Sequence, residues 1–457
     1  MKYHRLAVLV AAVTLVMDIL DLTIVNVAIP SLQASFGAGA AVAQWMVAGY
    51  ATVFAILLVT GGRLGDIYGY RRILMLGMGG FVLASLGCGA AVTPVQLIAA
   101  RLVQGGAAAM MLPQVMSLVQ ILYPPHRRVS ILSVFGVLGG AAAVAGPVLG
   151  GLIIGADWFG LGWRPIFLIN GPVGLLALAL ARLCLPSGGS PRAPRLDLPG
   201  MILSAVTVLA VMFPLIEGRD FGWPGWCFAL LGGAVPLALL LARYSLGRMR
   251  RDGSALIVPD LFRIPAFARG LAVSVSFEAA ASGLLFTLSL LLQQGLGLSP
   301  AAAGLAHVPY ALGVAVGIGG LTRRILPRVG ARLLGWGALV MGCGLTGLLL
   351  LLGLAPPAAL TPLTLSPVLL AMGLGMGLVT GPLSPLALSE VDPGHAGAAS
   401  GLLKTVQQLG GAFGVAAAGG LFYAWGFAAG AVIVFAGLGS VAVLARKFPT
   451  SPRLTAR

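Results

Sequence analysis

The chain has 457 residues, of which 59% are hydrophobic and only 9% are charged. A soluble domain carries roughly 25% charged residues, so this composition excludes a soluble globular protein and predicts an integral membrane protein. The formal net charge is +16. Nucleic-acid binding does not explain that charge, because the basic residues are dispersed over short loops without interleaved aromatic residues.

Apolar segments of about 20 residues recur along the whole chain, and a helix of that length crosses a bilayer. The first segment contains Asp18 and Asp21 and lacks a small-residue cleavage site, so we expect a retained helix rather than a secretory signal. We predict fourteen spans, at residues 6–29, 41–61, 73–92, 96–119, 130–154, 163–184, 198–216, 225–242, 268–292, 300–322, 333–354, 363–388, 397–419 and 425–444.

The arginines between the spans test this count independently, because cytoplasmic loops carry more Lys and Arg than the loops on the other side. Every second loop is basic, and the intervening loops hold only Arg219, with Arg164 at the edge of one. The basic loops contain Arg63, Arg71, Arg72, Arg127, Arg128, Arg182, Arg192, Arg195, Arg243, Arg248, Arg250, Arg251, Arg263, Arg269, Arg323, Arg324, Arg328 and Arg332. This unbroken alternation predicts fourteen helices in the cell membrane with both termini in the cytoplasm.

Two loops of the chain have similar sequences. The loop after the second span reads "GRLGDIYGYRR" and the loop after the tenth reads "RRILPRVGARL", and aligning Gly69 with Gly330 places Arg71 on Arg332. Related six-helix halves are common in transporters, which bind substrate near the midplane between them. We therefore predict an all-α integral membrane protein with two related halves: a six-helix bundle at 1–185, a two-helix insert with cytoplasmic flanks at 186–253, and a second bundle with a cytoplasmic lead-in and tail at 254–457.

Few ionisable side chains lie inside the predicted spans, and charged groups in a helix bundle face a cavity or each other. Asp18 and Asp21 are three residues apart and share one helix face. Arg101, in the fourth span, lies at a depth close to that of Asp21. The two residues can pair if spans 1 and 4 are neighbours, either as a static pair that only fixes helix packing or as part of a functional site.

Two carboxylates and one arginine leave one carboxylate without a cationic partner. We expect that group to keep its proton, because burial and a like charge both oppose ionisation, and we expect the two acids to titrate as a coupled unit. Such a site suits proton-coupled exchange. Glu278, near the middle of the ninth span, is either a second proton site or counter-charge for a cationic substrate, or a protonated acid bonded to a neighbouring helix. His307 fits a neutral hydrogen-bonded histidine better than a coupling residue.

The fifth span contains "AGPVLGG", whose small residues permit close helix packing and whose proline bends the helix. The sequence lacks a phosphate-binding G-x-x-x-x-G-K loop, an H-E-x-x-H motif and a G-x-S-x-G motif. The four cysteines are scattered without metal-site spacing. We therefore expect no enzyme activity and no cofactor, with transport driven by the proton gradient.

Several motifs now resemble those of the 14-helix drug:proton antiporters of the major facilitator superfamily (EmrB/QacA type). The similar stretches are "LDLTIVNVAIP" (20–30), "QWMVAGY" (44–50), "GRLGDIYGYRR" (62–72), "RLVQGG" (101–106), "AGPVLGG" (145–151), "WRPIFLINGPVG" (163–174) and "LLLQQGLGLSPAAAGL" (290–305). The resemblance covers nearly the whole chain, and the order of the motifs is more specific than any one of them. It implies proton-driven export of amphiphilic compounds by alternating access.

The resemblance assigns proton coupling to Asp21 and Arg101, and an inner-gate role to Asp66 beside a helix N-terminus. Asp18 and Glu278 are not family motif positions, and we add them as candidates for proton coupling. For gating we predict Gly62, Asp66, Gly69, Arg71 and Arg72, and for the antiport helix Gly146, Pro147, Gly150 and Gly151. For the substrate cavity we predict Asp18, Asn26, Tyr50, Gln104, Asn170, Glu278, Gln293 and His307.

This sequence departs from the family pattern at two motif positions. Ala142 replaces the first glycine of the helix-five motif, and Ile67 replaces a basic residue in the loop signature. We expect Asp21 to carry the proton and Asp18 to distinguish this transporter. Three acids against one arginine favour a lipophilic cationic or zwitterionic substrate such as a drug or antibiotic. The alternative is export of a lipid or endogenous secondary metabolite. In either case we expect a monomer in the bilayer whose partners are protons and a small amphiphile, without nucleic acid.

Overall fold

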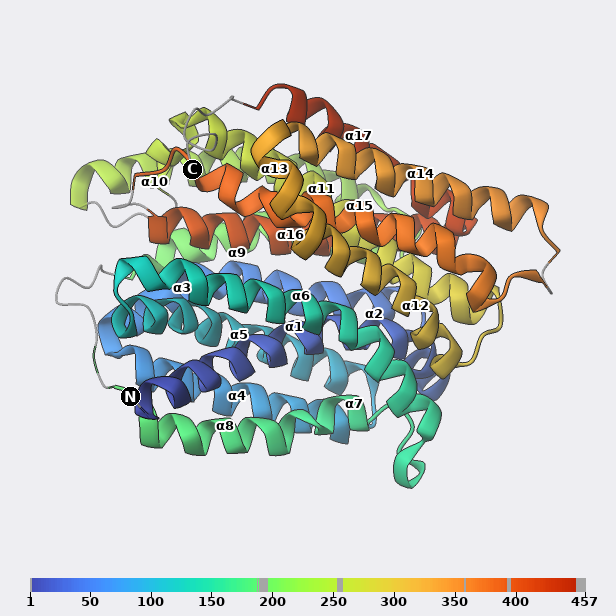
Figure 1. The fold of residues 1–457 in the computed structure, drawn as a ribbon, viewed down its shortest axis with the longest axis horizontal. Coiled ribbons are helices and arrows are strands. Elements are labelled where there is room, and N and C mark those ends of the chain that lie inside the picture. The colour runs from blue at the N-terminus through green and yellow to red at the C-terminus, as the bar shows by residue number, and fades with distance from the viewer. Residues whose placement is uncertain are drawn as a thin grey trace. The chain divides into compact units, whose positions relative to one another are not determined.

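The computed structural model describes residues 2–186, 188, 196–252, 258–356, 359–392 and 396–448. The described residues are almost entirely helical and contain no strand (Figure 1). The α-helices are α1 (Lys2–Phe36), α2 (Ala40–Gln44), α3 (Tyr50–Tyr68), α4 (Tyr70–Ala90), α5 (Pro94–Leu122), α6 (Pro125–Ala156), α7 (Pro165–Leu168), α8 (Asn170–Cys184), α9 (Leu198–Glu217), α10 (Gly225–Asp252), α11 (Pro265–Leu290), α12 (Pro300–Ala315), α13 (Arg323–Val329), α14 (Arg332–Leu354), α15 (Pro362–Leu388), α16 (Ala396–Trp425) and α17 (Phe427–Arg446). Short π-helical turns are η1 (Trp45–Gly49), η4 (Leu291–Gly295) and η5 (Val316–Thr322), and 3₁₀ turns are η2 (Trp158–Gly160) and η3 (Pro259–Arg263).

Thirteen helical runs of the described chain are long and apolar enough to cross a membrane, and each coincides with one predicted span. The fourteenth predicted span, 397–419, lies in α16, which is not among the thirteen. That helix has 30 residues, so its length is sufficient, but Lys404, Gln407 and Gln408 lower its hydropathy. The count of fourteen and the cytoplasmic position of both termini stay predictions. Two of the predicted basic-loop residues, Arg192 and Arg195, lie outside the described residues.

The chain packs as two compact units. The N-terminal unit comprises Met1–Leu22, Gln33–Ala143 and Gly160–Pro259, and the C-terminal unit comprises Thr23–Leu32, Val144–Phe159 and Asp260–Arg457. The boundaries fall inside α1 and α6, so one segment of each of these helices packs with α11–α17. The two helices predicted as an insert, α9 and α10, belong to the N-terminal unit.

In the N-terminal unit, α5 packs closely against both α3 and α4. Glycine makes the α3–α5 approach possible, because a Cβ on Gly61 would fall on the Ala109 carbonyl, and one on Gly105 would fall on the Tyr50 carbonyl. Small residues at helix crossings are a general device in membranes, where lipid offers no hydrophobic driving force. This approach fixes the position of Tyr50, which is fully buried.

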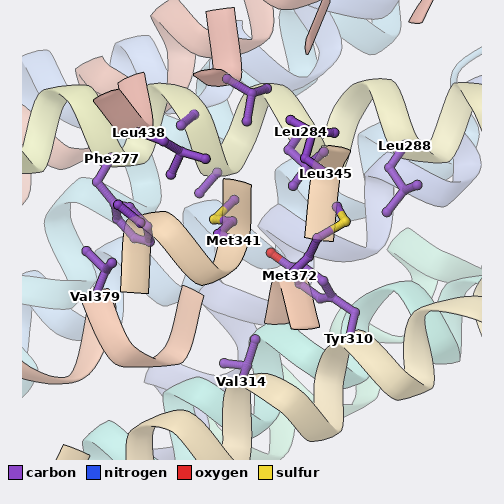
Figure 2. Close-up of a cluster of buried hydrophobic side chains, with 14 of the residues drawn as sticks. Phe277, Leu284, Leu288, Tyr310, Val314, Met341, Leu345, Met372, Val379 and Leu438 are labelled. Carbon is purple, nitrogen blue, oxygen red and sulfur yellow. The ribbon is translucent and has the colours of Figure 1, made fainter. Parts of the chain in front are cut away.

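In the C-terminal unit, α11 is the central helix and packs against α16, α17 and α15. Figure 2 shows the interior of this unit, with Phe277 and Leu284 of α11 among side chains of α14, α15 and α17 that include Met341, Met372 and Leu438. All five of these side chains are at most 4% exposed. The unit therefore has a continuous apolar core that holds α11 in place.

Both of the similar turns contain a glycine with a positive φ. Gly69 ends α3 and precedes α4 with a φ of 98°, and Gly330 ends α13 and precedes α14 with a φ of 58°. L-residues rarely adopt positive φ because Cβ clashes with the backbone, so glycine is the residue that permits both turns. The alignment of Gly69 with Gly330 made from sequence is thus matched by the backbone.

The helix α9 makes polar contacts at both of its ends, one with η1 and one with α10. At one end, the Trp45 indole Nε1 of η1 donates to Glu217 Oε1 at 2.7 Å, and the Trp45 ring lies 6.2 Å from the Phe213 ring. At the other end, buried Asp197 accepts a hydrogen bond from the Tyr244 hydroxyl at 2.6 Å, which joins α9 to α10. The hydrogen bond to Trp45 therefore holds α9 and α10 against the rest of the unit, in addition to the chain connection.

Replacing Trp45 by Phe should lower the stability of the purified protein in detergent by about 1–2 kcal/mol, because the bond to a carboxylate is lost while ring packing remains. The measurement is a thermal unfolding midpoint. Trp226→Phe is the matched control, since the Trp226 ring also stacks on Phe213 but makes no hydrogen bond among the described residues. Equal effects of the two variants would show that the bond to Glu217 contributes nothing.

Candidate functional site

A buried ion pair joins α1 to α5. Arg101 Nη1 contacts Asp21 Oδ2, and both side chains are 0% exposed. An ionised side chain in a bilayer-spanning helix is costly unless it is paired and hydrogen-bonded. Spans 1 and 4 are therefore in contact at the depth of these residues, as the sequence predicted conditionally.

The second oxygen of Asp21 accepts hydrogen bonds from two amides. Gln104 Nε2 of α5 donates to Asp21 Oδ1 at 2.8 Å, and Asn170 Nδ2 of α8 donates to the same atom at 2.9 Å. Both amides also donate to Ser85 Oγ of α4, at 2.7 and 3.2 Å. Three donors thus surround one carboxylate, and the bonds connect four helices.

The amide of Gln104 has a defined orientation. Its Oε1 accepts a hydrogen bond from Arg101 Nη1 at 2.7 Å, and a guanidinium can only donate. The nitrogen of the amide must then face Asp21 and Ser85. This assignment follows from the hydrogen-bond pattern, which is how amide orientations are decided.

The guanidinium of Arg101 is held by main-chain and aromatic contacts as well. Its Nε donates to the Met46 carbonyl at 3.0 Å, and its Cζ lies 4.3 Å from the centre of the Tyr50 ring. Met46 lies in the π-helical turn η1, and such a turn departs from regular α-helical bonding, which frees a carbonyl for a side chain. Among the described residues, the Arg101 Nη2 atom has no hydrogen-bond partner.

The second acid of α1 is coupled to this pair through Tyr50. The Tyr50 hydroxyl donates to Asp18 Oδ1 at 2.6 Å, and the face of the same ring contacts the Arg101 guanidinium. Asp18 is 4% exposed and Tyr50 is 0% exposed. One aromatic side chain therefore touches both Asp18 and the cation that binds Asp21.

Sequence reasoning identified Asp18, Asp21 and Arg101 but missed Ser85 and the Met46 carbonyl. A usable signal was present for Ser85, because it is the only hydroxyl-bearing residue in the apolar span 73–92. Tyr50, Gln104 and Asn170 were predicted in the substrate cavity. The structure has them buried around the ion pair, at most 3% exposed, and their contact with substrate stays a prediction.

Glu278 lies on α11 in the C-terminal unit and is half-buried. Lys404 of α16 is near enough for its charge to act on the Glu278 carboxylate. The count of three acids against one arginine made from the sequence did not include Lys404. Including it gives three acids and two cations, so the excess of negative charge is smaller than predicted.

The remaining predicted cavity residues make local hydrogen bonds. The His307 Nδ1 atom lies 2.8 Å from the Ala303 carbonyl, one turn earlier on α12, and His307 is 2% exposed. A carbonyl only accepts, so Nδ1 carries the hydrogen, as in the hydrogen-bonded histidine that we favoured. Asn26 Nδ2 donates to the Thr23 carbonyl at 3.3 Å, and Gln293 Nε2 donates to the Val27 carbonyl at 2.9 Å.

The predicted gating residues surround the turn between α3 and α4, with Gly62 about two helical turns before Gly69. Asp66 lies in the last turn of α3, which continues to Tyr68, and is therefore close to the start of α4. Its carboxylate accepts a hydrogen bond at 2.9 Å from the hydroxyl of Tyr70, the first residue of α4. Arg71 donates to the main-chain carbonyls of Arg182 and Leu185 at the end of α8, whereas Arg72 is exposed.

The predicted antiport motif lies in the segment of α6 that packs with the C-terminal unit. A Cβ on Gly146 or Gly150 would collide with Thr23 or Ile24 of α1, and one on Gly151 would lie 2.8 Å from the Gly304 Cα of α12. The helix continues through Pro147 without interruption. The motif glycines therefore present two faces, one to α1 and one to α12.

The sequence matches the model of the Major Facilitator Superfamily over residues 11–415. It is 42% identical over 410 residues to the probable actinorhodin transporter of Streptomyces coelicolor, covering 89% of this chain and 70% of the relative. It is 36% identical over 418 residues to the puromycin resistance protein pur8 of Streptomyces alboniger, covering 91% and 80%. In fold it is similar to the crystal structure of a D-xylose-proton symporter, with a TM-score of 0.66 and 18% identity over 100% and 99% of the two chains.

Replacing Gly151 by Leu should destabilise the protein by about 1–3 kcal/mol, because the added side chain overpacks the α6–α12 crossing. The measurement is again the thermal unfolding midpoint in detergent. Gly136→Leu, on the same helix, is the control, since nothing lies within 4 Å of a Cβ there. If both substitutions were equally tolerated, α6 and α12 would not be in close contact in solution.

Proposed function

We propose, from the premise that this chain belongs to the Major Facilitator Superfamily, that it exports a small amphiphilic antibiotic or drug in exchange for protons. The chain is a multi-pass membrane transporter and not an enzyme. The observation that carries the proposal is the buried Asp21–Arg101 pair with Asp18 and Tyr50 beside it. The substrate class is supported by the relatives named as an actinorhodin transporter and a puromycin resistance protein, and the direction by a relative named as a cephamycin export protein.

A buried carboxylate pair beside one cation is suited to proton exchange, because adding a proton changes the net charge of the site by one unit. Neutralising charge at a buried site alters the free energy of every conformation in which that site stays dry. Proton uptake on one side of the membrane and release on the other can then be linked to a change of conformation. This linkage is what an antiporter requires.

Of the two acids, we assign the exchanging proton to Asp18. A protonated carboxyl becomes a donor and needs an acceptor. The N–H groups of Arg101, Gln104 and Asn170 that surround Asp21 cannot accept. The hydroxyl of Tyr50 can donate or accept, so its bond to Asp18 can persist with reversed direction when Asp18 takes a proton. Asp21 is then the fixed charge that holds Arg101, which differs from our expectation from the family resemblance.

The substrate class follows from charge and from the relatives. The three acids Asp18, Asp21 and Glu278 outnumber the two cations Arg101 and Lys404 by one. This excess favours a cationic or zwitterionic amphiphile. The runner-up is export of an endogenous secondary metabolite. It is favoured by the relative named as an actinorhodin transporter, whereas the relative named for puromycin resistance favours drug efflux.

The exchange role of Asp18 can be tested in proteoliposomes loaded with a fluorescent lipophilic cation such as ethidium. Asp18→Asn should abolish efflux driven by an imposed pH gradient. Exchange of labelled for unlabelled substrate without a gradient should remain and should no longer depend on pH. Retention of gradient-driven efflux by this variant would overturn the assignment. Tyr50→Phe should show a weaker form of the same defect, since it removes the hydroxyl that accompanies the proton.

Asp21→Asn should behave differently in the same assay. It leaves Arg101 buried without a counter-charge, so both gradient-driven efflux and simple exchange should be lost, while membrane insertion, measured by protein level in the membrane fraction, is retained. Adding Arg101→Gln to Asp21→Asn should restore thermal stability but not gradient-driven efflux. Unchanged efflux in Asp21→Asn would contradict proton coupling through this pair.

A further inference from the structure

A basic pocket lies at the end of the N-terminal unit where α3, α4 and α8 meet. Its volume is about 670 Å³, and its lining includes Arg71, Arg72 and Arg182 together with Tyr68 and Met75. The helices α4 and α8, which supply the arginines, pack side by side (Figure 1). The buried ion pair described above is formed by other residues and does not line this pocket.

The three arginines differ in how they are engaged. Arg71 is held by the carbonyls of Arg182 and Leu185. The side chains of Arg72 and Arg182 are exposed and, within the described part of the chain, take part in no hydrogen bond or ion pair. The acid nearest in sequence, Asp66, accepts its hydrogen bond from Tyr70. Three arginines therefore line one pocket, and no carboxylate is among the described residues that line it.

Arginine guanidinium groups match the geometry of phosphate oxygens better than any other side chain. Large exposed apolar side chains lie close in sequence to the lining arginines. Leu76, one turn into α4 from Arg72, is 64% exposed, and Leu183, next to Arg182, is 74% exposed. Tyr68 on the rim is 55% exposed. A positively charged pocket with exposed apolar residues near it in sequence fits a ligand that has an anionic head and an apolar tail.

We propose that this pocket binds the phosphate headgroup of an anionic phospholipid, with the acyl chains lying along Leu76 and Leu183. Basic pockets between membrane helices on the cytoplasmic side commonly bind such headgroups. The three helix ends belong to loops that the arginine pattern assigns to the cytoplasm. The site lies at the turn of the predicted gating residues, so an occupied pocket would tie α4 to α8 there. The proposal concerns binding and does not depend on the transported substrate.

Phosphate is also available from solution, and the test separates the two sources. Purified protein in a neutral detergent is titrated with short-chain phosphatidylglycerol, with short-chain phosphatidylcholine, and with inorganic phosphate, and the thermal unfolding midpoint is followed. We expect phosphatidylglycerol to raise the midpoint at concentrations where the other two have no effect. An equal response to inorganic phosphate would overturn the lipid assignment, and an equal response to phosphatidylcholine would overturn the requirement for an anion.

The Arg72→Gln/Arg182→Gln double variant should raise the half-maximal phosphatidylglycerol concentration by about tenfold or more, since each basic residue near the surface contributes several-fold to binding an anionic lipid. Arg323→Gln/Arg324→Gln is the matched control, because it removes the same charge from two other exposed arginines. Arg182→Gln alone should give an intermediate shift if the double variant fails to fold. Identical titrations for the wild type, the control and the Arg72 and Arg182 variants would overturn the site.

Discussion

The constraint on which the rest of the N-terminal unit depends is the charge of Arg101 inside an apolar bundle. A guanidinium there needs a counter-charge and partners for its N–H groups. Gln104 of α5 itself supplies one partner, and the Asp21 carboxylate, the Met46 carbonyl and the Tyr50 ring supply the others. The last three come from α1, η1 and α3, which must approach α5 closely. Gly105 permits that approach, and η1 releases the carbonyl. The π-helical turn η1 and the small residue Gly105 therefore occur next to the buried charge of Arg101, where they give its guanidinium room and a partner.

The same physics separates the roles of the two acids. Asp21 is surrounded by donors that can only stabilise a fixed negative charge, whereas Asp18 contacts a hydroxyl whose role can reverse. Because the Tyr50 ring also contacts Arg101, a change at Asp18 reaches the ion pair through one side chain. The site can thus combine a permanent pair that holds the helices with an adjacent group that changes charge.

Charge is used differently at the helix ends. At the pocket lined by α3, α4 and α8, Arg71 is half-buried and donates to main-chain carbonyls, whereas Arg72 and Arg182 are exposed. Among the described residues, the two exposed side chains make no hydrogen bond or ion pair, and no acid lines the pocket. Such an arrangement suits the binding of an external anion. It does not add an internal ion pair that would stabilise the fold. The α9 and α10 pair has a further kind of attachment, in which an aromatic donor and a carboxylate join it to the N-terminal unit.

The sequence by itself determined the class of protein, thirteen of the apolar helices, the short list of buried ionisable residues and the glycine turns at Gly69 and Gly330. These properties follow from hydropathy, helical periodicity and backbone sterics, which act within one segment. Only the tertiary structure decided that Arg101 binds Asp21 while Asp18 binds Tyr50, that Ser85 joins them, that Lys404 lies near Glu278, and that α9 and α10 belong to the N-terminal unit. Those contacts join helices far apart in the chain. The depth of each residue in the bundle and the direction of its side chain depend on how the helices cross. A local sequence pattern does not specify these crossings.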